Sequence, residues 1–470
     1  MTTSLDMFTH GKARDSPGRG PFPAPIPALA GTFSATNVLK ILHISTRLIL
    51  GGSQENTVLS CEGQARLGHE VHLAFGPIYG PEGSLLKRVE AFRTDDGRGI
   101  TTHVVPSLVR SINPWHDARC WFQLRALMQK IDPDIVHTHS SKAGIIGRGA
   151  GWSVSSWADE LWYTGLSEPA GIVHTIHGPP FMPISGGTLS RLKTRFSNRI
   201  YEIAERYAAK RCHAIVSVAK SMTDQFLARS IGRPEQYTTV YSGMEVEPYL
   251  TPRPGESRDE MRSSLGLADG DFVVGTVARL AEHKGHDDLL SALADDLRTT
   301  HTMKLLWVGD GWWRQRLIER AQSLGLKVAQ LDRGEPVDRV HGASVVLTGL
   351  VPPERVPGLI RAMDVLAHPS LREGLPRTVP QALLTGVCPV AYDCDGTGEA
   401  CIDKQTGRLV KTGDVAGLRE AVRWCAANPA QRQQLAQRGR AMCADRFSAQ
   451  TMVRELEAVY QRALSIARNS

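Results

Sequence analysis

Short runs of β-branched and other apolar residues alternate along the chain with longer segments of helical periodicity. In the first half, five such runs predict buried parallel strands at 38–45, 69–75, 134–140, 171–178 and 213–219. Helix-sized segments separate several of these runs, at 53–67, 116–131 and 186–211. This alternation is typical of a doubly wound α/β domain.

The same pattern restarts after a segment rich in proline and charge. Six further runs predict strands at 271–280, 303–311, 344–351, 364–370, 388–393 and 407–411. We therefore predict two facing doubly wound domains, with a ligand in the cleft where the carboxyl ends of both sheets meet. The predicted boundaries are 37–245 for the first domain, 246–260 for the linker, 261–445 for the second domain and 446–470 for a C-terminal helix that crosses back to the first domain.

Several other stretches change this picture little. Residues 1–36 are rich in Pro, Gly, Ser and charge, so we expect a disordered N-terminal tail. Two inserts, at 153–169 and 326–342, carry no functional signal. No run of eighteen apolar residues and no signal-peptide h-region is present, and the eight cysteines form no Cys-x-x-Cys pair, so we expect a cytoplasmic protein with reduced thiols.

The chain carries an excess of positive charge. Lys and Arg number 55 against 48 Asp and Glu, which gives a formal net charge of +7. Basic residues are enriched at 191–213, which reads as an amphipathic helix; it is either a solvated face or a contact with anionic lipid head groups at the inner face of a membrane. We expect Ile200, Ile203, Tyr207 and Ala208 to face inward there and the basic side chains to face outward. Nucleic acid is not expected as a partner, because no aromatic and basic stripe accompanies the charge.

Three strand-to-helix turns carry candidate chemistry. Gly51 and Gly52 precede a helix, where backbone can approach an anion or an acceptor, although a plain turn fits equally well. Arg279 and Lys284 follow a strand and can hold a diphosphate, the arginine by its fork and the lysine as a point charge, although a solvated loop pair fits equally well. The third turn follows the strand at 364–370.

In that third turn a carboxylate stands beside a helix N-terminus. Glu373 can accept sugar hydroxyl protons, while the amides of Gly374 and Leu375 can face phosphate oxygens. Gln381, eight residues after Glu373, has a structural alternative as well. Thr378 and Gln381 fit a capping box, in which the Gln381 side chain would bond back to the backbone of Thr378.

Together these stretches resemble the family 4 retaining glycosyltransferases (glycosyl transferases group 1), which have the GT-B fold of two facing Rossmann-like domains and a deep interdomain cleft. The resemblance covers about residues 38–465. It is carried by stretches that include GGSQEN, LGHEVHLAF, PDIVHTHSSKAGIIGRGA, VHTIHGPPF, VARLAEHKG, LLWVGDG and DVLAHPSLREGLPRTVPQAL.

The resemblance implies roles for individual residues. Glu373 would contact the donor sugar hydroxyls, Arg279 and Lys284 the diphosphate, and His177 the region of the reacting bond; Gly51, Gly52, Gly309, Gly374 and Leu375 would help to bind the donor. The family's Glu-x7-Glu signature is altered here, because Gln381 takes the place of the second glutamate. A neutral amide oxygen still accepts a ribose hydroxyl, at a cost of about 1 kcal/mol, so we expect an active site.

The implied reaction moves a sugar from a UDP- or GDP-sugar to an acceptor hydroxyl with retention at the anomeric carbon. The acceptor would be a glycan or a lipid-linked molecule of polysaccharide or glycolipid synthesis. No cofactor and no metal are expected: His137 and His139 share a strand face, but the family has a similar stretch without metal. Two alternatives stay open, a sugar-nucleotide epimerase or hydrolase of the same fold and a non-catalytic sugar-nucleotide binding protein.

Overall fold

The computed structural model describes residues 38–78, 83–155, 165–179, 181, 188–334, 340 and 342–469. The predicted tail at 1–36, most of the insert at 153–169 and part of the insert at 326–342 lie outside these ranges. Leu39–Ser470 forms one compact unit. The domain boundaries expected from the sequence therefore stay a prediction.

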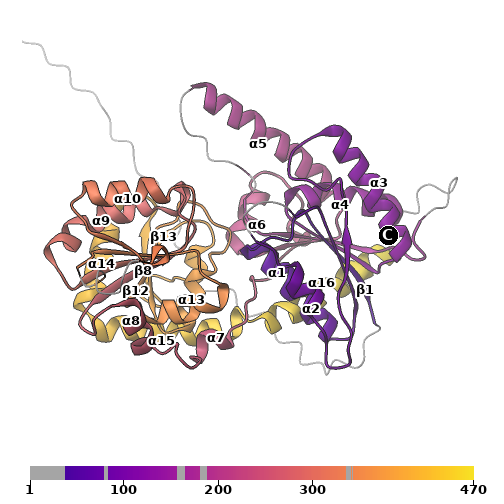
Figure 1. Ribbon diagram of the computed structural model, residues 1–470. Helices are drawn as coiled ribbons and strands as arrows, with labels where there is room; N and C mark the ends of the chain where they lie inside the picture. The colour runs from indigo at the N-terminus through magenta and orange to yellow at the C-terminus, as the bar shows by residue number, and fades with distance from the viewer. Residues whose placement is uncertain are drawn as a thin grey trace, which may run out of the picture. The chain divides into compact units, whose positions relative to one another are not determined.

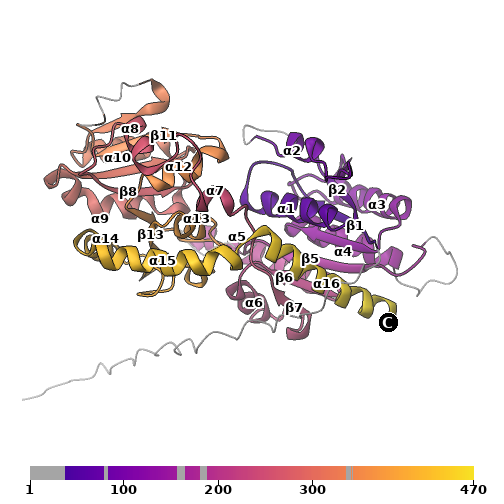
Figure 2. The same ribbon diagram turned by 90° about the horizontal axis from the view of Figure 1, so that it is seen from below.

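The first half of this unit is built on a parallel sheet (Figures 1 and 2). Within the described residues the sheet has seven strands in the order β3-β2-β1-β4-β5-β6-β7, and its paired neighbours are all parallel. The strands are β1 (Lys40–Ser45), β2 (Glu70–Phe75), β3 (Thr101–Val104), β4 (Ile135–His139), β5 (Gly171–Ile176), β6 (Ala214–Ser217) and β7 (Tyr237–Thr239). The helices are α1 (Gly52–Arg66), α2 (Leu86–Ala91), α3 (Pro114–Ile131), α4 (Ser141–Ser155), α5 (Thr188–Ala209), α6 (Lys220–Leu227) and α7 (Glu247–Leu250).

The second half repeats this architecture. Its described strands form a parallel sheet in the order β10-β11-β9-β8-β12-β13-β14. They are β8 (Phe272–Val277), β9 (Met303–Val308), β10 (Val328–Gln330), β11 (Val345–Gly349), β12 (Val365–His368), β13 (Cys388–Asp393) and β14 (Arg408–Lys411). The helices are α8 (Arg258–Leu265), α9 (His286–Thr299), α10 (Arg314–Ser323), α12 (Val356–Arg361), α13 (Thr378–Leu384), α14 (Val415–Ala427), α15 (Pro429–Arg446) and α16 (Ala449–Asn469).

All eleven predicted strands are present, and the structure adds three short ones. These are β3, β7 and β10, of three or four residues each. They lie at the edges of the two sheets, where one flank stays open, and most of their side chains are only partly buried. Because such a strand needs no continuous apolar run, it gives no hydrophobic signal in the sequence.

The last helix returns to the first sheet. α16 packs against α1 and β5, and the Gln64 amide nitrogen donates to the Tyr460 hydroxyl at 2.7 Å (Figure 2). Just before α16 the chain pairs with the segment that leaves the first sheet, because the Met244 amide donates to the carbonyl oxygen of Phe447 at 2.9 Å. Within the described residues no helix is both long enough and apolar enough to cross a bilayer.

Helix α5 differs from the expectation. Most of its basic side chains are exposed as expected, but Arg206 is partly buried and its guanidinium donates to the carbonyl oxygen of Arg229. Ile200, Ile203 and Tyr207 are about half exposed, so their predicted inward placement is wrong. Ala208 is buried as predicted. The helix packs on α4 through its opposite face, where Glu205 forms an ion pair with Arg148 of α4 at 2.6 Å. Its larger apolar side chains are thereby left at the surface.

Candidate functional site

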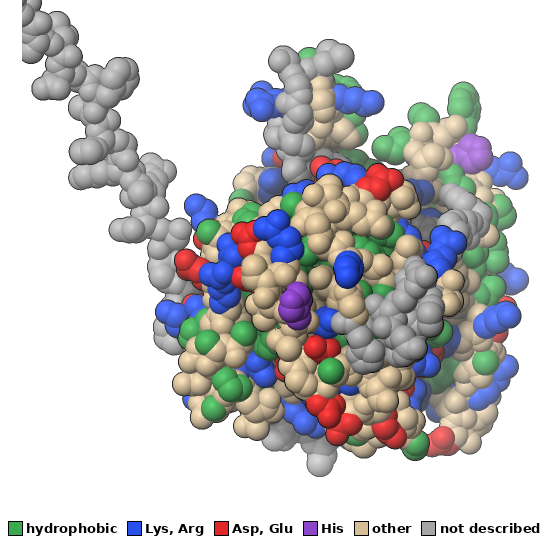
Figure 3. All heavy atoms as spheres, turned by 60° about the vertical axis from the view of Figure 1, so that its left-hand side comes forward, with side chains coloured by type: hydrophobic (Ala, Val, Ile, Leu, Met, Phe, Trp, Pro, Cys, Tyr) green, Lys and Arg blue, Asp and Glu red, His purple; other side chains and the backbone are tan. Residues whose placement is uncertain are grey.

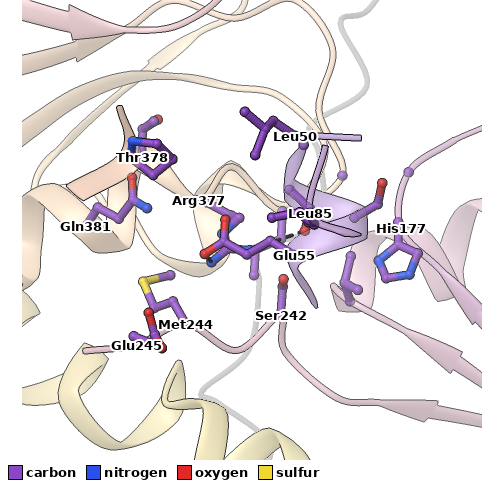
Figure 4. A pocket seen from close by; sticks show the side chains of 18 of the residues that line it. Leu50, Glu55, Leu85, His177, Ser242, Met244, Glu245, Arg377, Thr378 and Gln381 are labelled. Atoms are coloured by element: carbon purple, nitrogen blue, oxygen red, sulfur yellow. Dashed lines mark hydrogen bonds and ion pairs between the residues drawn. The ribbon is translucent and has the colours of Figure 1, made fainter. Parts of the chain in front are cut away.

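A pocket of about 850 Å³ is lined by segments at the carboxyl ends of both sheets (Figure 4). From the first sheet come the turn after β1 at 50–53 and the end of β5 at His177, Gly178 and Pro179. From the second sheet come Lys284 and the turn after β12, which runs into α13. The carboxyl edge of a parallel sheet is the usual ligand-binding edge of α/β folds, so this pocket is the candidate active site.

Glu373 is held by several polar groups at the start of this turn. The Lys284 ammonium lies 2.5 Å from its Oε1, and His368 Nε2 lies 3.2 Å from the same oxygen. The backbone amide of Glu373 donates to Asp395 at 2.7 Å. Burial alone would raise the pKa of the carboxyl, but Lys284 and His368 outweigh it and hold the pKa well below its usual range. Glu373 is therefore an anion throughout the neutral range, and its oxygens can accept hydrogen bonds from hydroxyl groups.

Gly374 brings the two halves of the pocket into close contact. A Cβ built on this residue would lie 2.1 Å from the carbonyl oxygen of His177. Any side chain at this position would force the turn after β12 away from the end of β5. Gly374 thus fixes how near Glu373 and His177 can lie, which is a different requirement from the phosphate contact expected from the sequence.

The structural alternative for Gln381 is wrong. Helix α13 is capped by Arg377, without a side-chain capping bond, and Thr378 is its first helical residue. The Gln381 side chain instead lines the pocket, as Tyr249 does, with 9% of its surface exposed. Gln381 is therefore available to a ligand as a neutral acceptor, at the opposite end of the pocket from His177 (Figure 4).

Arg377 is a pocket residue that the sequence analysis did not single out. Its guanidinium donates to the Glu55 carboxylate at 2.9 Å and to the carbonyl oxygen of Gly52 at 3.2 Å (Figure 4). These bonds join the turn after β1 to α13, and the Arg377 side chain is only 11% exposed. No local pattern marks Arg377, because its partners lie more than 300 residues away in the sequence.

Two predicted donor residues lie outside the lining of this pocket as the described residues form it. Arg279 is exposed after β8, with its guanidinium 5.6 Å from the ring centroid of Trp312. Gly309 has a φ of +136°, and a Cβ there would lie 2.2 Å from the carbonyl oxygen of Ala278. Gly309 therefore has a packing reason to be glycine, and both donor-binding roles stay predictions. The remaining predicted residues line the pocket: Gly51, Gly52, His177, Lys284, Glu373, Gly374, Leu375 and Gln381.

His177 lies at the end of β5 and contacts a second histidine. Its Nε2 is 3.1 Å from Nδ1 of His139. Burial, with a smaller contribution from the positive charge of Arg377, lowers the pKa of His177 to about 4. At neutral pH the ring therefore carries one proton, and it presents either a donor or an acceptor to a ligand according to its tautomer.

Two family models match most of the chain. The model described as Glycosyltransferase Family 4 matches residues 50–247, and the model described as Glycosyl transferases group 1 matches residues 271–428. The first match contains the turn after β1 and the end of β5. The second contains Lys284 and the turn after β12.

Relatives of the chain carry glycosyltransferase names. The 2-deoxystreptamine N-acetyl-D-glucosaminyltransferase of Streptomyces fradiae is 31% identical over 231 residues, 48% of this chain and only 50% of that enzyme, so this match spans half of the relative's length. The UDP-Gal:alpha-D-GlcNAc-diphosphoundecaprenol alpha-1,3-galactosyltransferase of Escherichia coli is 24% identical over 386 residues, 81% of this chain and 86% of that enzyme.

Solved structures show the same fold. HepE of Anabaena, in complex with UDP and glucose, has a TM-score of 0.66 at 18% identity and covers 90% of this chain and 99% of its own. WaaG, a glycosyltransferase involved in lipopolysaccharide biosynthesis, has a TM-score of 0.62 at 17% identity and covers 92% of this chain and 100% of its own. With two parallel sheets that each contribute to one pocket, the chain belongs to the family 4 glycosyltransferases (glycosyl transferases group 1) and is a glycosyltransferase of the GT-B fold.

Proposed function

We propose that this glycosyltransferase moves a sugar from a nucleotide diphosphate sugar to an acceptor hydroxyl, with retention at the anomeric carbon. One observation supports this most: an anionic carboxylate, Glu373, is paired with the Lys284 ammonium in a pocket that His177 also lines. A carboxylate accepts sugar hydroxyls and an ammonium attracts phosphate, so the pair has the chemistry that a sugar diphosphate requires.

Retention follows from attack on the face that the leaving group vacates. In the proposed reaction the departing diphosphate accepts the proton of the acceptor hydroxyl while that oxygen bonds to the anomeric carbon. Negative charge then builds up on the diphosphate, and Lys284 and Arg279 stabilise it. No metal is required in this scheme, because the two cations and the backbone amides near Gly374 supply the positive potential.

A UDP-sugar is our preferred donor. The galactosyltransferase relative is named for UDP-Gal, and HepE was solved with UDP. Gln381 would accept a ribose hydroxyl where relatives use a carboxylate. We expect the protein to gain thermal stability with UDP or a UDP-sugar in the presence of a chelator. A ligand at 100 times its Kd adds about 2.7 kcal/mol, which is readily measured as a rise in Tm.

The activity test compares charge-removing variants with a matched control. Lys284→Ala and Arg279→Ala should each lower turnover by orders of magnitude, since each removes a charge that stabilises the leaving group. Lys220→Ala, in an exposed pair with Asp224 on α6, should leave turnover unchanged. Near-normal turnover of both Lys284→Ala and Arg279→Ala would refute the proposal. Release of free nucleotide or isomerised sugar without an acceptor would instead favour an epimerase or hydrolase.

We also propose that the acceptor is lipid-linked and that the enzyme reaches it at an anionic membrane surface. An apolar stripe on α5 supports this: Leu192, Phe196, Ile200, Ile203 and Tyr207 are all about half exposed or more. At 100° per residue these five positions fall within an arc of about 80°. Exposed basic residues flank the arc, with Arg195 and Arg199 on one side and Lys193 on the other. Such a helix binds in the head-group region of a bilayer.

One face of the molecule carries surface charge of both signs (Figure 3). On the face drawn in Figure 3, Lys and Arg side chains are interspersed with acidic ones rather than gathered in one patch. The membrane proposal therefore rests on α5. Flotation with vesicles containing anionic lipid should be lost in Phe196→Ser/Ile200→Ser and retained in Phe122→Ser, which changes an equally exposed ring on α3. Flotation of the double variant at the wild-type level would refute the proposal.

A further inference from the structure

A continuous line of hydrogen-bonded side chains leads from the interior of the first sheet to the pocket. It begins at Gln64 on α1, whose Oε1 lies 2.7 Å from His43 Nε2. His43 Nδ1 lies 2.9 Å from His139 Nε2, and His139 Nδ1 lies 3.1 Å from His177 Nε2. Gln64, His43 and His139 are buried, so the line ends at the one member that lines the pocket, His177.

Each histidine in this line holds a single ring proton at neutral pH. Burial lowers the pKa of His43 to about 4 and the pKa of His139 well below its usual range. The pKa of His177 is about 4 as well. A neutral imidazole has one N–H donor and one acceptor nitrogen, so the role of one nitrogen fixes the role of the other.

The hydrogen bonds of Gln64, at the buried end of the line, determine which atom is the donor in each bond along it. The Gln64 amide nitrogen donates to the Tyr460 hydroxyl at 2.7 Å, so Oε1 is the atom that accepts from His43 Nε2. The Tyr460 hydroxyl then donates to His137 Nδ1 at 2.7 Å, and His137 Nε2 donates to Thr175 at 2.7 Å. Both branches from Gln64 are thus satisfied with one consistent set of protons.

The direction passes from ring to ring. His43 donates its only N–H, at Nε2, to Gln64, so Nδ1 of His43 accepts a hydrogen bond from His139 Nε2. His139 then has its proton on Nε2, and its Nδ1 accepts from His177 Nε2. The paired rings are close to parallel, at 19° for the first pair and 28° for the second, with centroids 5.2 and 5.3 Å apart. At the pocket, Nδ1 of His177 is left without a proton.

We propose that Gln64, His43 and His139 are positioning residues, which hold the His177 ring in place as its Nε2-protonated tautomer so that Nδ1 accepts a hydrogen bond from a substrate hydroxyl. The inference deepens the proposed function and rests on it for the identity of that hydroxyl. The reverse order of protons would require the Gln64 amide to turn over and would make Nδ1 of His177 a donor, suited to a carbonyl or phosphate oxygen.

A metal ion is the competing use of this cluster. Ring atoms of His43, His137 and His139 all lie within 4.8 Å of one another. Hydrogen bonds already join His43 to His139 and His137 to Tyr460, and a metal ligated by these nitrogens would displace the protons they share. Stoichiometric zinc or another transition metal in the purified full-length protein would overturn the proposal.

The direct test is the ring ¹⁵N spectrum of the ligand-free protein, labelled in histidine. The His177 signals are assigned by their loss in His177→Gln. We expect a protonated Nε2 and an unprotonated Nδ1 for His177 in the wild type. A protonated Nδ1 would overturn the proposal, and the measurement does not depend on whether any sugar is transferred.

Two variants break the line, and one control does not. His43→Phe keeps a ring but removes both nitrogens, and Gln64→Met keeps the side-chain length but removes the acceptor for His43. His174→Phe is the matched control, because His174 is a buried histidine of β5 that does not belong to the line. Its Nδ1 instead lies 2.9 Å from the hydroxyl and 3.1 Å from the carbonyl oxygen of Thr138. If His43→Phe does not fold, the same measurements on Gln64→Met, at the end of the line, test the proposal.

In both His43→Phe and Gln64→Met we expect a mixture of His177 tautomers in place of the single one. We also expect kcat to fall on the order of tenfold or more, with the KM for the donor little changed. His174→Phe should keep the wild-type His177 signals even where it lowers Tm. If the line variants retain the wild-type tautomer and kcat, the line has no positioning role. If transfer activity is absent in the wild type but the tautomer responds as expected, the proposed function fails and the positioning role stands.

Discussion

Replacing Lys284 with methionine should destabilise the protein in a way that depends on pH. In the wild type the Lys284 ammonium lies 2.5 Å from Glu373, and their side chains are 19% and 12% exposed. Methionine preserves most of the length and apolar volume of lysine but removes the charge. The variant thus leaves a buried carboxylate with His368, at 3.2 Å, as its nearest partner.

The size of the effect follows from burial. Breaking one side of a buried ion pair costs about 3–5 kcal/mol, because the remaining charge stays desolvated. In the wild type the depressed pKa of Glu373 contributes stability that is present above about pH 4.5 and is lost as pH falls through the folded-state pKa. In the variant, burial dominates and raises the pKa of Glu373, so the carboxyl takes up a proton at a higher pH. The difference between the two proteins should be largest near pH 7 and shrink toward pH 5.

The assay is chemical denaturation of wild type, Lys284→Met and Lys220→Met at several pH values from 7.5 to 5. Lys220 is the control, because it pairs with Asp224 at 2.8 Å with both side chains about 60% exposed. Its loss should cost less than about 1 kcal/mol, because solvent screens an exposed pair. Equal destabilisation by the two substitutions, or a Lys284→Met effect that is the same at pH 7 and pH 5, would refute this account of the site.

Three further predictions concern the pocket and its support. Gly374→Ala should abolish transfer, since its Cβ would lie 2.1 Å from a backbone oxygen, whereas Gly270→Ala, with no atom within 4 Å, should be as active as wild type; kcat of both variants checks this. Arg148→Met should lower the free energy of unfolding by about 3–5 kcal/mol, and adding Glu205→Gln should recover part of that loss, because a buried carboxylate is then no longer left unpaired. Gln381→Glu should tighten UDP binding several-fold in calorimetry, since a charged acceptor gains about 1 kcal/mol over a neutral one, and weaker binding would show that Gln381 does not contact the nucleotide.

The strand pattern could be predicted because each central strand is buried on both faces. Such strands require apolar runs whatever their partners are, so β1, β4, β8 and β12 stand out in the sequence. The short edge strands β3, β7 and β10 were missed for the opposite reason. The exposed stripe of α5 was also misassigned, because periodicity shows that a helix has an apolar face but not whether another element covers it.

Some residues of the candidate site could likewise be predicted from the sequence, and others could not. Glu373, Gly374 and Lys284 follow strand ends, and a strand end in a parallel sheet is a position that the sequence can identify. The sequence could not identify Arg377, or the line from Gln64 through His43 and His139, because each depends on contacts between segments that are distant in the chain.

The sequence by itself therefore determined the fold class, the family and the turns that carry the chemistry, because these depend on local pattern and on residues at strand ends. Only the tertiary structure decided which partner each polar side chain takes. It pairs Lys284 with Glu373, places the Gln381 side chain in the pocket lining instead of in a helix cap, and connects His177 to the protein interior. The physical reason is that the pKa and the tautomer of a buried group depend on desolvation and on neighbours a few ångströms away, and folding alone brings those neighbours together.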